Sequence, residues 1–482
     1  FNGSYTGVFG NANVGTGKTV TITSSYSGAD VGNYSVTDQT STTADISAKT
    51  LTATASTANK TYDATNTATA TLTLSGLVGS ETLSTTNTST FNNKNVGTGK
   101  TVTVNSITLA DGTNGGLAAN YSISTGQTTT ADITAKSLTV SGITASNKTY
   151  DATTTATLNT GSVTYTGLVS GDVFNGTYTG AFSDKNVGTG KTVTITPSYT
   201  GADVSNYSVT DHSTVTANIT AKALTVSGIT ASDKTYDATT SATLGTGSVS
   251  YGGLVSGDTL TGTYSGVFAD ANVAAGKTVT ITSSYGGTDV NNYTITDQTS
   301  TTADITAKAL TATASASNKT YDASDTATTT LTLSGFIGTE TVTSTNSSTF
   351  NNKNVGTGKT VTVNSITLAD GTNGGLAANY SISTGQTTTA DITAKSLTVS
   401  GITASNKTYD ATTTATLNTG SVTYTGLVSG DVFNGTYTGA FSDKNVGTGK
   451  TVTITPSYTG ADVSNYSVTD HSTVTANITA KA

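Results

Sequence analysis

The sequence predicts an all-β protein built as a tandem array of small modules of about 86 residues. Three observations support this fold class. A Lys-Thr-Tyr-Asp-Ala segment recurs at domain-sized intervals, and the polar residues are mostly Thr, Ser, Asn and Gly. Short runs of alternating apolar and polar residues are separated by turn residues about every ten positions, which is typical of all-β domains.

The composition favours exposed sheet with a thin core. Only 34% of the 482 residues are hydrophobic and 10% are charged, whereas about a quarter are charged in ordinary proteins. Low hydrophobicity leads to disorder when net charge is high, but a net charge of −8 over this length is weak. Thr is β-branched and suits a half-exposed pleated surface, so a Thr-rich chain favours antiparallel strands over coil.

Two markers define the repeat. The tyrosine of the Lys-Thr-Tyr-Asp-Ala segment recurs at spacings of 88, 86, 85 and 88 residues, at Tyr62, Tyr150, Tyr236, Tyr321 and Tyr409. An Ala-Lys pair closes each repeat, with its lysine at Lys49, Lys136, Lys222, Lys308, Lys395 and Lys481. We therefore predict a partial repeat, the C-terminal part of a module, followed by five whole modules: 1–49, 50–136, 137–222, 223–308, 309–395 and 396–482.

The modules are of two types. Modules 50–136 and 309–395 share Leu-Ala-Ala-Asn-Tyr (117–121 and 376–380) and form type A, whereas the others carry Gly-Ala-Asp-Val or a close relative and form type B. Residues 91–223 reappear unchanged at 350–482, so the array has grown by duplication, which adds length. Each module is long enough to close a core of its own, and no flexible linker separates neighbours. We expect an elongated, semi-rigid rod.

Within module 137–222, the alternating runs predict both the core and the turns. The expected inward positions are Leu138, Val140, Val163, Tyr165, Tyr178, Phe182, Val193, Ile195, Tyr207, Val209, Val215, Ala217 and Ile219. Turns are expected at 167–172, 183–190 and 201–206, where Gly, Asn and Asp tolerate positive φ. Residues 151–158 would form one short helical turn at most.

What the composition lacks excludes several classes of function. The chain has no Cys, which excludes disulfides and thiolate metal sites. It has no Arg and a pI of about 4.7, so nucleic acid is not an expected partner. No apolar run approaches the roughly 18 residues of a membrane-spanning helix. The chain starts inside a repeat without a leader sequence, and we interpret it as a fragment or a processed product.

A Gly-Lys-Thr segment at 99–101 and 190–192 resembles the end of a phosphate-binding loop. That motif requires Gly five positions before its second Gly, but Lys94 and Lys185 stand there. A strand pattern follows, so no helix N-terminus would hold a phosphate. We interpret the segment as a hairpin turn.

Other candidate site residues also have structural interpretations. Tyr150 and Asp151 could form a sugar-binding site, because a Tyr beside a carboxylate can bind sugar. The favoured interpretation is that the Tyr packs on the module edge and the Asp caps a turn. Four aspartates, Asp132, Asp172, Asp184 and Asp203, offer oxygen ligands for Ca²⁺ at module junctions, but they fall in separate turns. His212 and His471 lack partners for zinc or catalysis and are expected in surface turns.

Two surface features complete the candidates. Asn-x-Ser/Thr sequons, such as those at Asn175 and Asn206, permit glycosylation, although many arise by chance in a chain so rich in Ser and Thr. The Thr-x-Thr run at 192–196 is similar to an ice-binding face, which requires a flat, regular array. We predict no catalytic, cofactor-binding or metal-binding residue, and no enzyme activity.

Four motifs recur in order through the chain: Lys-Thr-Tyr-Asp-Ala-Thr-Thr (148–154), Asn-Val-Gly-Thr-Gly-Lys-Thr-Val (186–193), Gly-Ala-Asp-Val-Ser-Asn-Tyr (201–207) and Ala-Asp-Ile-Thr-Ala-Lys (131–136). On these motifs the chain resembles the YDG/MBG-type repeats of large filamentous-haemagglutinin-like bacterial adhesins, which implies β-grasp-like or sandwich-like modules. One departure is uniform, because the family's Tyr-Asp-Gly is Tyr-Asp-Ala here, at Ala64, Ala152, Ala238, Ala323 and Ala411. Either the chain turns differently there, or that position never required Gly.

The resemblance implies export across a Gram-negative outer membrane, often by two-partner secretion, with the repeats as spacers. We therefore expect a structural stalk of an extracellular adhesin or surface fibre, located at the bacterial cell surface. Two alternatives remain open: modules that self-associate into a matrix filament, and repeats that bind glycans weakly but many times over. The expected partners are neighbouring modules and, in the filament alternative, other copies of the chain.

Overall fold

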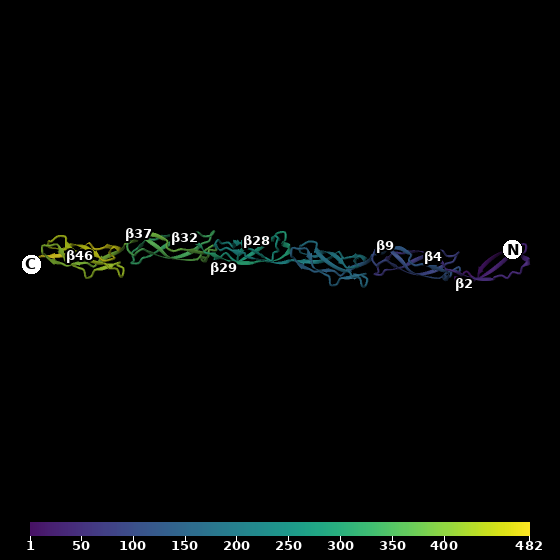
Figure 1. Cartoon of the computed structure of the whole chain (residues 1–482). Coiled ribbons are helices and arrows are strands. Elements are labelled where there is room, and N and C mark those ends of the chain that lie inside the picture. The colour runs from purple at the N-terminus through teal and green to yellow at the C-terminus, as the bar shows by residue number, and fades with distance from the viewer. The chain divides into compact units, whose positions relative to one another are not determined.

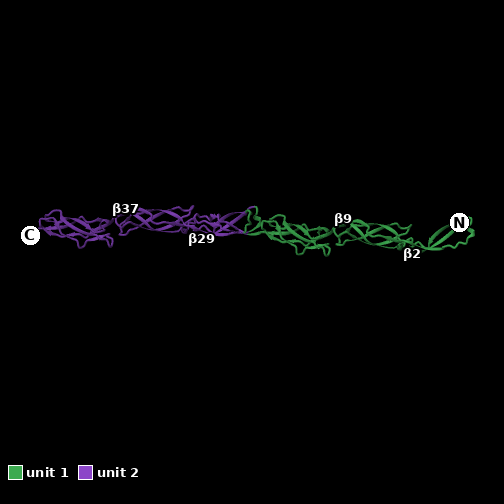
Figure 2. Cartoon of the chain, in the orientation of Figure 1, with its two compact units in different colours: residues 1–223, 253–259, 288–294 green, residues 224–252, 260–287, 295–482 purple.

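The structure is a computed structural model that describes residues 1–482, and it is all-β, as the sequence predicts. Figure 1 shows strands throughout the chain, and six three-residue 3₁₀ turns are its helical elements. The chain divides into two compact units, coloured in Figure 2. Unit 1 holds residues 1–223, 253–259 and 288–294, and unit 2 holds residues 224–252, 260–287 and 295–482. We keep the predicted ranges as names for the modules.

Module 137–222, in unit 1, represents the type B repeat. Its elements are β12 (Lys136–Ser141), β13 (Thr144–Ala145), β14 (Lys148–Thr149), β15 (Thr155–Ala156), β16 (Leu158–Asn159), β17 (Thr164–Thr166), β18 (Asn175–Phe182), β19 (Gly188–Thr200), η3 (Val204–Asn206), β20 (Tyr207–Thr210) and β21 (Thr214–Thr220). A five-stranded sheet has the order β14-β21-β19-β18-β15, a three-stranded sheet has the order β17-β12-β20, and β13 pairs with β16.

A long antiparallel hairpin forms the centre of the module. Strand β18 pairs with β19 from Asn175 opposite Thr200 to Phe182 opposite Val193, and β21 adds to the other side of β19. Two pairings are parallel: β12 with β20, and β14 with β21. The first and last strands of the module therefore lie in different sheets, and each has a parallel partner.

The remaining unit 1 elements repeat this plan. The partial repeat has β1 (Asn2–Phe9), β2 (Gly15–Ser27), η1 (Val31–Asn33) and β3 (Ser41–Ile46). Module 50–136 has β4 (Lys49–Thr57), β5 (Lys60–Thr61), β6 (Thr67–Ala68), β7 (Ala70–Ser75), β8 (Leu83–Phe91), β9 (Gly97–Asp111), η2 (Ala118–Asn120), β10 (Tyr121–Ile123) and β11 (Thr128–Thr134).

Module 223–308 contributes most of its residues to unit 2 and its 253–259 and 288–294 loops to unit 1. Its elements are β22 (Lys222–Ser227), β23 (Thr230–Ala231), β24 (Lys234–Thr235), β25 (Ser241–Ala242), β26 (Leu244–Gly245), β27 (Ser250–Gly252), β28 (Thr261–Phe268), β29 (Ala274–Gly286), η4 (Val290–Asn292), β30 (Tyr293–Thr296) and β31 (Ser300–Thr306).

Unit 2 also contains two whole modules. Module 309–395 has β32 (Lys308–Ala316), β33 (Lys319–Thr320), β34 (Thr326–Ala327), β35 (Thr329–Ser334), β36 (Val342–Phe350), β37 (Gly356–Asp370), η5 (Ala377–Asn379), β38 (Tyr380–Ile382) and β39 (Thr387–Thr393). Module 396–482 has β40 (Lys395–Ser400), β41 (Thr403–Ala404), β42 (Lys407–Thr408), β43 (Thr414–Ala415), β44 (Leu417–Asn418), β45 (Thr423–Thr425), β46 (Asn434–Phe441), β47 (Gly447–Thr459), η6 (Val463–Asn465), β48 (Tyr466–Thr469) and β49 (Thr473–Thr479).

The alternation of side chains places the predicted residues inside module 137–222. Buried positions include Leu138, Val140, Phe182, Val193, Ile195, Tyr207, Ala217 and Ile219, and the other predicted inward residues are half-buried. Most of these buried residues are followed by an exposed Thr or Ser, as expected when one face of a strand meets the core and the other meets water.

One local prediction is wrong in position. The Gly-Lys-Thr segment lies inside β19, not in the hairpin turn: Gly190 has a φ of 59° at a β-bulge between Gly188 and Lys191, and its N–H donates to Asn218. Residues 151–158, expected to form one short helical turn at most, contain no helix and include β15 and the start of β16. The short helical turn of this module is η3, within the predicted 201–206 turn.

The hydrophobic core has two kinds of cluster, so the expectation that each module closes a core of its own is only half correct. One cluster lies inside module 137–222 and is built on Val140, Ile143 and Ile195. The second crosses the predicted boundary and joins the end of module 50–136 to the start of module 137–222: Tyr62, Phe91, Val102, Ala131, Ile133, Leu138, Phe174 and Tyr207. Unit 2 has shared clusters of the same kind.

The alanine of Tyr-Asp-Ala adopts the conformation that favours glycine. Its φ is 63° at Ala64, 62° at Ala152, 59° at Ala238, 66° at Ala323 and 69° at Ala411. A left-handed residue with a Cβ costs roughly 1–2 kcal/mol. The chain therefore keeps a left-handed turn at this position, with strain that glycine would relieve.

We predict that replacing all five of these alanines with glycine stabilises the protein, by roughly 0.5–1 kcal/mol per site after the larger unfolded-state entropy of glycine is subtracted. Thermal and urea denaturation of the full chain will measure the change. The matched control replaces Ala68, Ala156, Ala242, Ala327 and Ala415, which lie in strands four residues later, and should destabilise. A lower Tm for the first variant than for the wild type would contradict the assignment of strain.

The shared cluster predicts that neighbouring modules stabilise each other. Residues 50–222 should unfold in one transition with at least about 3 kcal/mol more stability than residues 137–222 alone, because the isolated module leaves Leu138 and Phe174 without their partners. Urea unfolding followed by circular dichroism tests this. Tyr62→Ser in the pair should move its stability towards that of the single module, and equal stabilities for pair and single module would refute the coupling.

Candidate functional site at the module junctions

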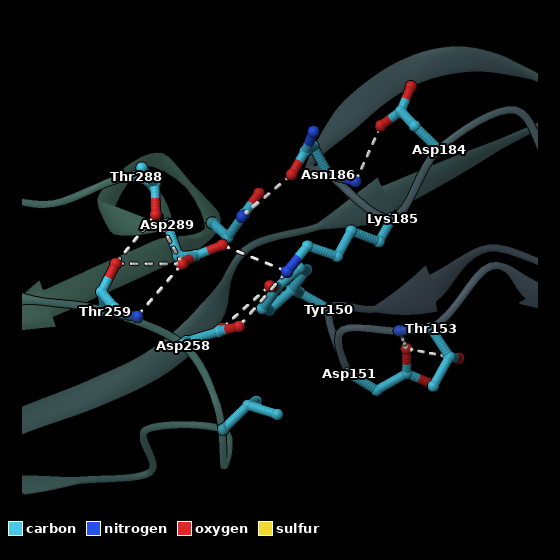
Figure 3. A network of polar contacts seen from close by, with 12 residues as sticks. Tyr150, Asp151, Thr153, Asp184, Lys185, Asn186, Asp258, Thr259, Thr288 and Asp289 are labelled. Atoms are coloured by element: carbon cyan, nitrogen blue, oxygen red, sulfur yellow. Dashed lines mark hydrogen bonds and ion pairs between the residues drawn. The ribbon is translucent and has the colours of Figure 1, made fainter.

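The densest polar cluster of each unit lies where one module meets the next. Tyr150 follows β14 and is 1% exposed, and its hydroxyl donates to Asp258 of the next module at 2.8 Å. Tyr293 donates to the same carboxylate oxygen at 2.6 Å. The two rings pack edge to face, 5.6 Å apart. One carboxylate is therefore held by two tyrosines, one from each module, and Figure 3 shows Tyr150 beside Asp258.

A lysine completes the charge balance. The Lys185 ammonium lies 3.4 Å from Asp258 and 3.2 Å from Asp289, and Figure 3 shows it between them. The side chains of Asp258 and Asp289 are 2% and 11% exposed, whereas Lys185 is 40% exposed. Asp289 also accepts from the Thr259 N–H at 3.1 Å and the Thr288 hydroxyl at 2.9 Å. Both buried carboxylates thus have several donors, as burial of charge requires.

An asparagine joins the backbones of the two modules. Asn292, at the end of η4, accepts from the Val187 N–H at 2.9 Å and donates to the Asn186 side chain at 3.2 Å. The equivalent bond recurs at every junction, from the N–H of Val14, Val96, Val273 and Val355 to Asn120, Asn206, Asn379 and Asn465. Burial of Asn292 at 3% exposure makes this a fixed contact.

The tyrosine and carboxylate also recur. In unit 1, Tyr62 donates to Asp172, which accepts a second bond from Tyr207. In unit 2, Tyr236 and Tyr380 both donate to Glu340, at 2.8 and 2.7 Å. At the last junction Tyr321 packs edge-on against Tyr466, 5.6 Å away, and Tyr466 donates to Asp431, while the Tyr321 hydroxyl makes no hydrogen bond.

These contacts shift the pKa values of the junction groups. Burial, and then the hydrogen bond to Asp258, raises the pKa of Tyr293 to about 12, and burial likewise raises that of Tyr150. The Thr259 N–H, the Thr288 hydroxyl and Lys185 hold the pKa of Asp289 below its usual value. The hydrogen bond to Asp289 raises the pKa of Lys185. Asp289 and Lys185 therefore stay charged across the neutral range.

The candidate site residues that the sequence suggested do not come together in one site. Tyr150 is buried at the junction, whereas Asp151 turns away to accept from the Thr153 N–H at 2.9 Å and to pair with Lys148 at 2.7 Å. The two do not form one site, and Tyr150 lies in an interface, not on an open module edge. Asp151 caps its turn, as interpreted from the sequence.

Of the four candidate calcium ligands, the structure brings only Asp172 and Asp203 together. The cation between them is the Lys94 ammonium, 3.7 and 3.2 Å away. Asp132 accepts from the Gly99 N–H, and Asp184 caps Asn186 and pairs with Lys191. No group of three or more His, Asp or Glu residues is placed to hold a metal ion.

The remaining candidates lie on the surface or in the interface. His212 and His471 are exposed in loops, and Asn175 is exposed on β18. Asn206 is 1% exposed and bonded to Val96, which makes its sequon inaccessible in the folded protein. Along β19, the threonines of 192–196 face solvent while Val193 and Ile195 are buried. None of these residues contacts the junction cluster except Asn206.

Sequence reasoning missed the junction lysine and asparagine. Lys94 and Lys185 were considered only as departures from a phosphate-binding motif. The Asn-Tyr pair at the end of each Gly-Ala-Asp-Val or Leu-Ala-Ala segment is present in every copy, and that persistence was the available signal for a shared structural role.

The tyrosine pKa values predict a delayed alkaline titration. A raised folded pKa means that the neutral hydroxyl is favoured, so its stabilisation is complete below pH 10 and is lost as pH rises towards 12. Tyr207, Tyr236 and Tyr293, three of the 22 tyrosines, should therefore ionise well above pH 10, together with unfolding. Absorbance at 295 nm will follow ionisation and circular dichroism will follow structure. The urea-unfolded chain should titrate in one step near pH 10; the same curve for the native chain would contradict the prediction.

No helix of the structure has the length and apolar character required to cross a membrane.

Comparison with known proteins places the repeats in a family. The YDG domain family matches five consecutive segments, residues 47–131, 134–216, 220–302, 306–390 and 393–476. No curated protein sequence matches the chain. Among solved structures, a crystal structure of Drosophila N-cadherin EC1-4 is similar at 9% identity, over 61% of this chain and 83% of that chain, with a TM-score of 0.20, which carries no argument about fold or function. Because the five matched segments cover most of its length, the chain belongs to the YDG domain family.

Proposed function

We propose that this chain is a structural spacer, a stretch of stalk in an extracellular bacterial adhesin or surface fibre, which extends a tip away from the cell. The observation that carries the proposal is that each module uses its ends to bind its neighbours. In module 137–222, the residues that contact the following module are Tyr150, Lys185 and Val187. Each added module therefore makes the stalk longer.

The shared clusters support a mechanical role. At the boundaries 136/137, 308/309 and 395/396, residues from both modules are packed into one apolar cluster, so these junctions cannot bend without exposing part of a core. In ordinary flexible arrays the modules are separated by Gly- or Ser-rich linkers. Here a single residue, Ala135, separates β11 from β12. These features favour a semi-rigid stalk.

The sheet edges favour the spacer over the self-associating filament. The five-stranded sheet of module 137–222 ends in β14 and β15, of two residues each. The three-stranded sheet ends in β17 and β20, of three and four residues. Such short outermost strands offer little backbone of their own to a second chain, which is one way that β proteins limit lateral pairing, and β15 covers Gly180 and Ala181 of β18.

Small-angle X-ray scattering tests the proposal with proteins of two, three and five modules, residues 50–222, 50–308 and 50–482. The maximum dimension should rise linearly, by about 30–45 Å per module. A five-module particle with the dimensions of a single compact globule would overturn the spacer proposal. A dimension that grows with protein concentration would indicate the self-associating filament instead.

A further inference from the structure

The junctions are of two chemical kinds, and the kind follows the type of the next module. Before each type B module the preceding module presents a lysine: Lys94, Lys185 and Lys353. Before each type A module the same position is alanine: Ala12 and Ala271. We call these lysine junctions and alanine junctions.

The lysine junction pairs one cation with two acids. Lys94 faces Asp172 and Asp203, Lys185 faces Asp258 and Asp289, and Lys353 faces Asp431 and Asp462, all at 3.2–3.8 Å. The second acid of each pair, which follows Gly-Ala or Gly-Thr in type B modules, also accepts a backbone N–H from the adjacent loop.

The alanine junction has lost both the cation and one acid. The type A residues that align with Asp203 are Leu117 and Leu376, each followed three positions later by the Asn-Tyr pair that recurs in every copy. The remaining carboxylate is the longer Glu340, whose two oxygens accept separately from Tyr236 and Tyr380. Ala271 packs against the shared apolar cluster of this junction. The lysine and the second aspartate thus appear together or not at all in five junctions.

We propose that this matched set is a recognition code that fixes which module type docks onto which: a module end with lysine accepts the two-aspartate face of type B, and a module end with alanine accepts the glutamate–leucine face of type A. The proposal goes beyond the spacer function, because it concerns the order of modules and holds for any role of the array. The specificity is electrostatic and works by penalising mismatches.

Each mismatch leaves a charge without a partner. A type B face docked on an alanine end would bury two carboxylates, both within 3.4 Å of the position of one missing ammonium, with like charges close together. A lysine end docked on a type A face would place its ammonium beside Leu376 and near a glutamate already engaged by two tyrosines. Either arrangement should loosen the junction.

Hydrogen exchange of the full 482-residue chain, followed by mass spectrometry, tests the code, because module 223–308 has its own sequence in both docking loops. Lys185→Met should speed exchange about tenfold in peptides covering 253–259 and 288–294, as a loss of about 1.4 kcal/mol does. Lys185→Arg keeps the charge and should stay within about twofold of wild type. Lys191→Met removes an ion pair inside one module, with Asp184, and should leave these peptides unchanged.

Two substitutions at the alanine junction provide a second test. Because the second substitution should reverse the effect of the first, the test distinguishes a mismatched junction from general destabilisation of the module. Leu376→Asp should speed exchange in the peptide 336–342, and adding Ala271→Lys should restore protection. The code is overturned if Lys185→Met exchanges like wild type, if Lys185→Arg exchanges like Lys185→Met, or if Ala271→Lys fails to reverse the effect of Leu376→Asp. Unchanged exchange in peptides from 224–245 will show that module 223–308 stays folded, so loosening is assigned to the junction alone.

Discussion

A buried carboxylate that accepts a hydrogen bond from a tyrosine of its own module, and at three of the four junctions also from a tyrosine of the preceding module, is the contact on which the junctions depend. Asp258 cannot be buried without the donors that Tyr150 and Tyr293 supply. The rings of the two tyrosines pack edge to face at the same place. Polar and apolar contacts are therefore made together at the junction, and a module is completed only by the module that follows it.

The strands and most buried positions follow from local pattern and were predicted from the sequence. A run such as 192–196 alternates Thr with Val or Ile, and only a strand with one buried face satisfies that period. One local feature was misplaced for a local reason. The left-handed Gly190 marks a bulge as readily as a turn.

The junction was beyond prediction because its members are far apart in sequence. Lys185 lies 73 residues from Asp258 and 104 from Asp289, and no periodicity within a module links them. The sequence shows alanine where the family has the glycine of Tyr-Asp-Gly. The left-handed φ of this alanine is fixed by the fold around it and not by its own preference. The expectation of independent cores was only half correct for the same reason: Leu138 was predicted as an inward residue of its own module, yet it packs in a cluster with Tyr62 and Ile133 of the previous module.

The parallel pairings of the module bear on how it would respond to tension. Strand β12 enters the module at Lys136, which is paired with Tyr207 at the start of β20, and the two strands run in the same direction. Strand β14 is parallel to β21 in the same way, and β21 carries the chain out. A force applied to the two chain ends acts along these strands in opposite directions. It therefore loads the hydrogen bonds between the paired strands in shear, all at the same time, and they cannot break one after another. Resistance to traction is thus a consequence of strand direction alone.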